Sequence, residues 1–438
     1  MTVKRWRRIL AAAVAILLAL GAARLCFLDG LLRRITIAGP SMAPSLCGAH
    51  YEIECSECVF PFRVDAESPP PNGEAACPNC GCVENKLAAS QLKSAERVII
   101  DSWPLLWRKP LRVEVVAARL PRESDGLVVK RVAAMEASFF SIEQGDLYVD
   151  RQLQRKTLEE LSAVRVLVHD NDFQHQPSKN LPPRWRSTQE ASNWTSHGSL
   201  FRHASPNATQ AEPDWLEYQH WPCTADATLR GTVAPIRDND SYNQGPGPRE
   251  LNAVSDLLLA CRVRCSGSGE LFFAATDGDQ RFEASFQSHL NGKNGDRSGE
   301  LQFPLSALSP AGSHIEFGLC DQQLLVAVDG RTIACRHYNR PVDAVTETLH
   351  PLAIGVRGLT VEISHLRVWR DIYLLNPQGL PSLWKSESIL PQQVVLLGDN
   401  PPVSIDSRHW QPAGIPPSDI LGLVRQPFWM RNRTRAVK

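Results

Sequence analysis

IEFGLCDQQLLVAVDGRTIACRHY, residues 315–338, decides the fold class of the largest part of the chain. Apolar and polar residues alternate here in short runs around Asp-Gly, which is typical of antiparallel strands joined by tight turns. Similar runs recur at intervals of about ten residues from DLLLACRVRC (256–265) to TVEISHLRVWRDIYLL (360–375). We therefore predict a mainly β protein in which residues 215–378 form an antiparallel β-sandwich.

The cysteine pattern upstream of this sandwich predicts a metal site. CSEC (55–58) and CPNC (77–80) each present two thiols that can meet one ion, and two such turns complete a closed tetrahedral shell. The spacer between them, VFPFRVDAESPPPNGEAA, is rich in proline and has few residues that could form a core. We predict an inserted zinc ribbon over 55–85 with a structural zinc ion, the ligands being Cys55, Cys58, Cys77 and Cys80. A pair of disulfides or a set of reactive thiols is the alternative interpretation.

The N-terminus predicts a membrane anchor. KRWRR (4–8) precedes the apolar run ILAAAVAILLALGAARLCFL (9–28), and Arg24 near its end could reach the interface. We expect residues 1–30 to form a cytoplasmic basic head and a transmembrane helix in contact with membrane lipid. The basic head favours a single-pass protein of the cytoplasmic (inner) membrane with its N-terminus inside and its body outside. A cleaved signal peptide is the alternative.

Composition bounds the remaining possibilities. A chain of 438 residues is long enough for two or three domains. Lysine plus arginine and aspartate plus glutamate number 47 each, so no basic excess is present to neutralise phosphates, and we expect no nucleic acid partner. Residues 156–214 contain a polar, proline-bearing stretch and are predicted to be a linker or irregular segment.

Three short stretches outside the sandwich carry candidate chemistry. GPSMAPSL (39–46) offers a serine, VVKRV (128–132) a lysine in an apolar run, and LLGDN (396–400) with SIDSR (404–408) a polar cluster. A serine hydroxyl needs a base, and a lysine can act as one when burial lowers its pKa. The period of a strand places Lys130 with Val128 and Val132 on one apolar face and turns Arg131 to solvent.

In that order along the chain, these stretches resemble the type I signal peptidases, which are membrane-bound serine proteases with a Ser-Lys dyad. The resemblance implies an all-β catalytic core in three parts, 31–54, 86–155 and 379–438, the last ending in a basic tail. It covers roughly 1–155 and 385–425, so the ribbon and the sandwich would be insertions. The sandwich itself is similar to jelly rolls of the concanavalin or laminin-G type.

The resemblance also implies roles for individual residues. Ser41 would be the nucleophile and Lys130 the general base, with no cofactor needed for the chemistry. The backbone N–H of Ser41 would form the oxyanion hole beside Gly39, and Met42 would line the substrate groove. Ser404 would orient the lysine amine. The supporting residues would be the turn at Asp399 and Asn400 and the charged pair Asp406 and Arg408.

The implied function is that of signal peptidase I, removing signal peptides from exported preproteins after a small-x-small site. The chain departs from the family pattern after Lys130, where RVAAMEASFFSIEQGD lacks the usual glycines. The alternative hypothesis is an inactive or specialised signal-peptidase-like protein whose sandwich binds a protein or glycan partner.

Overall fold

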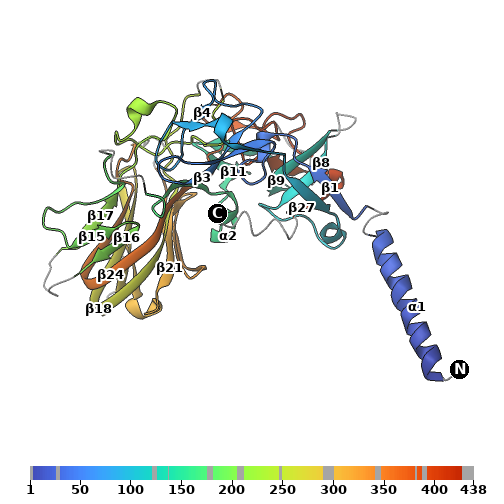
Figure 1. The fold of residues 1–438 in the computed structure, drawn as a ribbon, viewed down its shortest axis with the longest axis horizontal. Coiled ribbons are helices and arrows are strands. Elements are labelled where there is room, and N and C mark those ends of the chain that lie inside the picture. Colours follow the sequence, from blue (N-terminus) through green and yellow to red (C-terminus); the bar gives the residue numbers. More distant parts are fainter. Residues whose placement is uncertain are drawn as a thin grey trace.

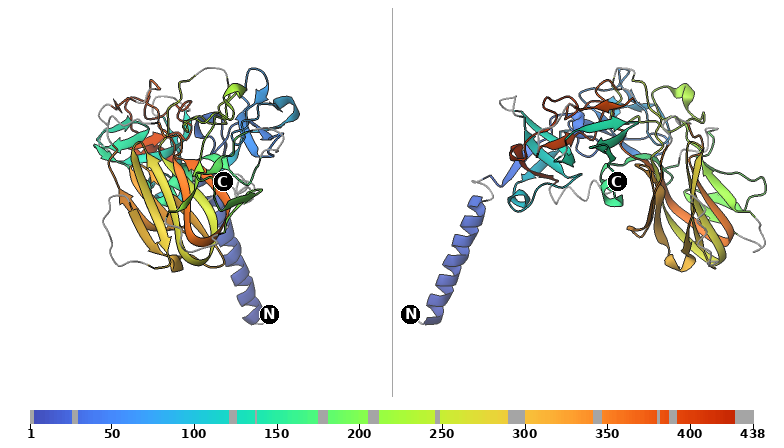
Figure 2. Two further views of the ribbon diagram at one scale, coloured as in Figure 1. Left: turned by 90° about the vertical axis from the view of Figure 1, so that its left-hand side faces the viewer. Right: turned by 180° about the vertical axis from the view of Figure 1, so that it is seen from behind.

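The protein is mainly β, and among the strands that the structure describes all neighbours are antiparallel except β19 and β20, which are parallel. The computed structural model describes residues 3–25, 30–120, 126–136, 138–174, 181–204, 212–245, 249–289, 300–340, 347–379, 382–386 and 392–426. The predicted basic tail, 428–438, lies outside them. The sandwich and a six-stranded sheet lie on opposite sides of the body, and α1 (Val3–Ala23) extends away beside the six-stranded sheet (Figure 1, Figure 2).

The six-stranded sheet joins segments from both ends of the chain. Its order is β1-β7-β27-β8-β9-β26, and each neighbouring pair is antiparallel. Apolar side chains that alternate along these strands are buried, among them Val98, Ile100 and Val132. The strands are β1 (Leu32–Thr36), β7 (Arg97–Asp101), β8 (Val115–Arg119), β9 (Leu127–Met135), β26 (Val394–Leu397) and β27 (Ile420–Arg425).

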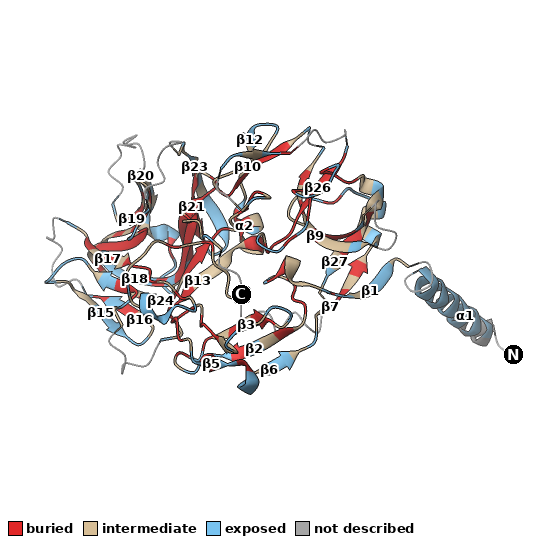
Figure 3. Ribbon diagram, turned by 90° about the horizontal axis from the view of Figure 1, so that it is seen from above, coloured by how far each residue is buried: buried red, intermediate tan, exposed pale blue. Residues whose placement is uncertain are grey.

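Two smaller units flank this sheet. A four-stranded sheet is built from β10 (Phe140–Glu143), β11 (Asp146–Val149), β12 (Gln152–Leu153) and β25 (Trp384–Lys385). The cysteine-rich segment forms the sheets of β2 (His50–Glu54), β3 (Pro61–Asp65) and β6 (Gln91–Lys93) and of β4 (Glu74–Ala75) and β5 (Asn85–Lys86). Viewed from above, this segment and the four-stranded sheet lie on opposite sides of the line from the sandwich to the six-stranded sheet (Figure 3).

The sandwich is built on two long strands, β18 (Leu257–Asp277) and β24 (Leu352–Arg370), which pair with one another over most of their length. Bulges interrupt the pairing, and Gly269 sits at one of them because a Cβ there would lie 2.1 Å from the carbonyl oxygen of Arg357. The two halves of each long strand pair with different neighbouring strands. These include β17 (Asp214–Tyr218), β19 (Gln280–Gln287), β20 (Glu300–Pro304), β21 (Ser313–Cys320), β22 (Gln323–Val328) and β23 (Arg331–His337).

The segment predicted to be a linker, 156–214, differs from that expectation. It contains α2 (Leu158–Val164), β13 (Val166–Asp170), β14 (Trp185–Ser187), β15 (Trp194–His197) and β16 (Leu200–His203). β13 and β16 pair with β24, and β14 and β15 pair with other strands of the same sheet. The strands are too short to show a clear alternation, and they are ordered by the long strand that they flank.

The prediction of a transmembrane anchor is wrong. Among the described residues, no helix is both long enough and apolar enough to cross a membrane. Basic residues occupy the start of α1, so its uncharged stretch, Ile9–Ala23, spans only about 22 Å at 1.5 Å per residue. A bilayer core is roughly 30 Å thick. The prediction of a single-pass protein of the inner membrane, with its N-terminus inside and its catalytic domain outside, is therefore also wrong.

Candidate active site

Ser41 and Lys130 meet although 89 positions separate them in the chain. Ser41 lies on η2 (Pro40–Met42), a single 3₁₀ turn that follows β1, and Lys130 lies in the middle of β9. The Nζ atom of Lys130 is 2.7 Å from the Oγ atom of Ser41, which is a full hydrogen bond. The two residues that the sequence singled out as nucleophile and base are therefore in direct contact.

The environment of Lys130 favours its neutral form. The residue is 4% exposed, and burial lowers the pKa of its amine to about 8 from an ordinary value of 10.5. The charges of Asp406 and Asp399 act to raise this pKa and that of Arg408 to lower it, but burial outweighs them. At pH 7 about a tenth of the amine is therefore neutral, and that form can accept a proton from Ser41.

Asp406 organises the polar cluster behind the lysine. Its carboxylate accepts hydrogen bonds from Nε and NH2 of Arg408 at 2.8 and 2.7 Å, from the N–H of Gly398 at 3.0 Å and from Oγ of Ser404 at 2.7 Å. Burial acts to raise the pKa of Asp406, but these partners hold it below its usual value. Asp406 and Arg408 form the predicted charged pair. Ser404, expected to orient the lysine amine, donates to Asp406 instead.

The turn at Asp399 and Asn400 holds the loop that carries Ser41. The N–H of Asn400 donates to the carbonyl oxygen of Ser41 at 3.1 Å, and its Nδ2 donates to that of Pro40 at 3.0 Å. Asn400 is 1% exposed, so these contacts are shielded from water. Gly398, directly after β26 (Val394–Leu397), lies so close to the nucleophile that a Cβ there would be 2.5 Å from the carbonyl oxygen of Ser41.

Arg131 was expected to point to solvent, and the structure corrects this. Its Nε donates to Oδ1 of Asp399 at 2.6 Å and its NH2 to Oδ2, a two-pronged ion pair that joins β9 to the turn after β26. Its NH1 also donates to the carbonyl oxygen of Val113 at 2.6 Å. Strand alternation does place Arg131 on the face opposite Lys130, but another part of the chain covers that face. In the sequence, the arginine that directly follows Lys130 was the only sign of this ion pair.

Met42 differs from the role that the resemblance implied. Met42 is 1% exposed and packs with Ile37, Leu46 and Val98 in a core cluster, so it does not line an open groove. Gly39 is extended, and a Cβ there would meet nothing within 4 Å. The N–H of Ser41 has no main-chain acceptor among the described residues, and it lies in the first turn of η2, where such groups are unpaired.

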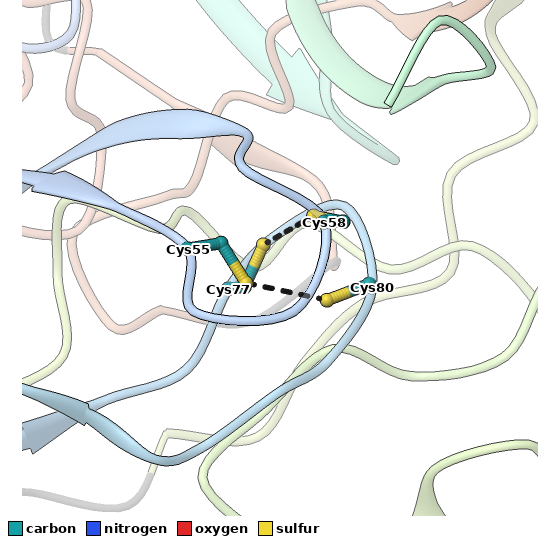
Figure 4. A group of neighbouring side chains, drawn as sticks. All are labelled: Cys55, Cys58, Cys77 and Cys80. Atoms are coloured by element: carbon teal, nitrogen blue, oxygen red, sulfur yellow. Dashed lines mark hydrogen bonds between the residues drawn. The ribbon is translucent and has the colours of Figure 1, made fainter. Parts of the chain in front are cut away.

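The four predicted metal ligands come together in the cysteine-rich segment (Figure 4). The Sγ atoms of Cys55 and Cys80 are 3.5 Å apart and those of Cys58 and Cys77 are 3.7 Å apart, and all four lie within 4.8 Å of one another. Four sulfurs at 2.3 Å from a tetrahedral zinc would be about 3.8 Å apart. These separations exclude disulfides, which need about 2.05 Å. The cluster could therefore hold a metal ion.

Comparisons with known proteins found no matching family model and no matching curated protein. Among solved structures, the carbohydrate-binding module CBM66 from Bacillus subtilis matches at 8% identity over 43% of this chain and 96% of that one, with a TM-score of 0.23. SCLam, an endo-β-1,3(4)-glucanase of family GH16, matches at 11% identity over 50% of this chain and 94% of that one, with a TM-score of 0.25. At these scores the matches assign no ligand to this chain.

These findings correct the predicted function. The two structures named above are a carbohydrate-binding module and a glucanase. A third structure, whose description concerns endo-acting O-glycanases of the human gut microbiota, matches at 8% identity over 46% of this chain and 98% of that one, with a TM-score of 0.25. The prediction of a membrane-bound signal peptidase acting in protein secretion is wrong, because no helix among the described residues could span a membrane, and neither a family model nor a curated protein of that family matches the chain. The prediction rested on short stretches within roughly 1–155 and 385–425.

Proposed function

We propose that this protein is a specialised serine hydrolase that cleaves acyl bonds, peptide bonds first among them, and whose sandwich binds a protein or glycan partner. The observation that carries the proposal is the 2.7 Å contact between Oγ of Ser41 and Nζ of Lys130, with the pKa of the buried lysine lowered to about 8. A hydroxyl paired with a largely desolvated amine is the arrangement that activates a nucleophile without histidine.

The chemistry follows from this pair. Neutral Lys130 accepts the hydroxyl proton of Ser41 as Oγ attacks the carbonyl carbon, and the N–H of Ser41 stabilises the oxygen anion that forms. The lysine ammonium then gives its proton to the leaving group, which departs and leaves an acyl ester on Ser41. Lys130, neutral again, takes a proton from a water molecule as that water attacks the ester carbonyl. The Lys130 ammonium then returns the proton to Oγ of Ser41 as the C–O bond of the ester breaks, which releases the carboxylic acid and restores both residues. The ion pair of Arg131 and Asp399 keeps β9 and the turn after β26 in register.

Zinc bound by Cys55, Cys58, Cys77 and Cys80 would have a structural role, because four thiolates leave no open position for substrate. The cysteines form part of the small core of their segment with Ile53, Phe60 and Phe62, so metal binding and folding of the segment are coupled. We expect one zinc per chain by metal analysis, and Cys77→Ser to lose it. A chain that folds and cleaves substrate with no bound metal would contradict this role.

The experiment that tests the hydrolase uses p-nitrophenyl acetate and a peptide library with wild type, Ser41→Ala and Lys130→Ala. We expect wild type to release a burst of p-nitrophenol, to carry an acetyl group on Ser41 by mass spectrometry and to cut peptides, and both variants to do none of these. Ser90→Ala and Lys93→Ala are matched controls on the surface of the cysteine-rich segment and should behave as wild type. Acylation of Lys130→Ala at the wild-type rate would exclude the dyad.

The binding role of the sandwich is tested with the full-length Ser41→Ala chain. Binding to a defined set of oligosaccharides, competed by the same free sugar, would identify a glycan partner. Absence of binding to any of them, together with saturable binding to the protein whose peptides the wild type cuts, would identify a protein partner. Binding to neither would leave the hydrolase without this second role.

A further inference from the structure

A short segment between β17 and β18, residues 240–245, touches three parts of the molecule at once. At the sandwich end, NH2 of Arg370 donates to the carbonyl oxygen of Asn239 at 2.9 Å, just before the segment begins. Tyr242 is 1% exposed and packs with Ala43 and Cys47 on the loop that follows the nucleophile. The segment therefore passes directly behind the loop that carries Ser41.

Asn243 makes the contact closest to the nucleophile. Its Nδ2 donates to Oδ1 of Asn400 at 2.6 Å, and Nδ2 of Asn400 donates back to Oδ1 of Asn243 at 2.9 Å. A primary amide has two N–H donors on one side and an oxygen on the other, so this reciprocal pair fixes which way the Asn400 amide faces. Only in that orientation can the second N–H of Asn400 reach the carbonyl oxygen of Pro40, at 3.0 Å.

The next residues tie the segment to the cysteine-rich unit. Oε1 of Gln244 accepts from the N–H of Ala76 at 2.7 Å, and its Nε2 donates to the carbonyl oxygen of Ala76 at 2.9 Å. Ala76 immediately precedes Cys77, one of the four clustered cysteines. Gly245 lies so close to the same unit that a Cβ would meet Oγ of Ser68 at 2.0 Å. The segment is thus held at both ends, and Asn243 has a defined position.

We propose that Asn243 is a positioning residue for the nucleophile: it orients Asn400, and Asn400 holds the main chain of Pro40 and Ser41 against Lys130. The proposal rests on the proposed Ser41–Lys130 hydrolase. Asn243 touches neither Ser41 Oγ nor Lys130 Nζ by any hydrogen bond among the described residues, so its effect passes through the main chain. The segment 240–245 thereby contributes to the geometry of the Ser41–Lys130 pair.

The test is burst kinetics with p-nitrophenyl acetate on the full chain. The burst amplitude counts the chains with a competent site, and the burst rate measures acylation of Ser41. We expect Asn243→Ala to lower the burst rate about tenfold, the size of effect that follows when a buried amide loses its partner. Its amplitude and the pH midpoint near 8 should stay unchanged. Asn239→Ala is the matched control, since no hydrogen bond of its side chain is found among the described residues, and it should react as wild type.

A double-mutant cycle separates positioning from general damage. If Asn243 acts through Asn400, the variant Asn243→Ala with Asn400→Ala will be no slower than Asn400→Ala alone. Independent, multiplying effects would overturn the proposal, and so would equal slowing by Asn243→Ala and Asn239→Ala. If Asn243→Ala does not fold, Asn243→Leu replaces it in the cycle, because it keeps the approximate shape, removes the donor and acceptor and adds no charge. A wild type without a burst refutes the hydrolase and the positioning role together, whereas a wild-type burst rate in Asn243→Ala refutes the positioning role only.

Discussion

Two lysines, the buried Lys130 and the partly buried Lys156, occupy opposite electrostatic environments in the same protein. Lys130 contacts a neutral hydroxyl, and burial lowers its pKa to about 8. Burial acts in the same direction on Lys156, but its Nζ lies 2.7 Å from a carboxylate oxygen of Asp321 and 2.7 Å from one of Asp371, and these charges raise its pKa well above the usual value.

The difference shows that burial alone does not make a lysine into a base. Near Lys130, the carboxylate of Asp406 accepts hydrogen bonds from Arg408, Ser404 and the N–H of Gly398. No hydrogen bond between this carboxylate and the Lys130 amine is found among the described residues. Around Lys156 the carboxylates bind the amine directly, and it joins the segment before α2 to the sandwich. Of these two lysines, only the one whose amine has no direct carboxylate partner can accept a proton near neutral pH.

The largest effect that follows is on catalysis. Lys130→Met should lower the acylation rate of Ser41 by about 10³-fold, within the range that a positioned base contributes. Lys156→Met should leave the acylation rate of the chains that fold within about twofold, since Lys156 makes no contact with Ser41. Burst kinetics with p-nitrophenyl acetate measure both. A large loss of rate in folded Lys156→Met would erase the distinction between the two lysines.

The second effect is on stability, where Lys156→Met rather than Lys130→Met is expected to cause the large loss. Lys156→Met removes the partner of two buried carboxylates and should lower the free energy of unfolding by about 3–5 kcal/mol at pH 7. Urea denaturation followed by tryptophan fluorescence measures this loss. Lys93→Met, which breaks a half-exposed pair with Glu52, should cost about 1 kcal/mol or less. A loss equally small for Lys156→Met would mean that the two carboxylates do not depend on the amine.

Lys130→Met should stabilise the fold below pH 8. The folded-state pKa of about 8 lies below the ordinary 10.5, so the unfolded chain binds more protons between these values. The charged amine therefore costs the folded state up to about 3 kcal/mol at pH 7, and this cost is relieved as pH rises from 8 to 10.5. Thermal unfolding across pH 6–10.5 should show the gain from Lys130→Met shrinking over that interval. A gain that does not vary with pH would place its origin in packing.

The smallest effect is the pH dependence of the wild-type rate. Only neutral Lys130 accepts the proton of Ser41, so the acylation rate should rise about tenfold per pH unit below pH 8 and level off above it. Stopped-flow measurements of the burst rate from pH 6 to 9.5 would locate the midpoint. A midpoint below 7 or above 10 would contradict the environment described for this lysine.

Several features could be predicted from the sequence because their signal is local. The spacing of Cys55, Cys58, Cys77 and Cys80 alone predicted one cluster, since two-residue gaps let neighbouring thiols face one ion. The alternation in 315–338 predicted antiparallel strands, and β21, β22 and β23 pair in that way. The strand period placed Lys130 on one face with the buried Val132 and the partly buried Val128, and the family pattern singled out Ser41 as its partner.

Only the tertiary structure decided the remaining features, because their partners lie far apart along the chain. Asn243 and Asn400 are 157 positions apart, and Arg131 and Asp399 are 268 apart, so neither pair leaves a pattern in a local window. The short strands of 156–214 are ordered by β24, and nothing in their own composition says so. The sequence determined which groups could react and which faces must be buried. Only the tertiary structure decided which distant groups come into contact. It therefore also decided that Lys156 contacts two carboxylates and that Lys130 contacts a hydroxyl.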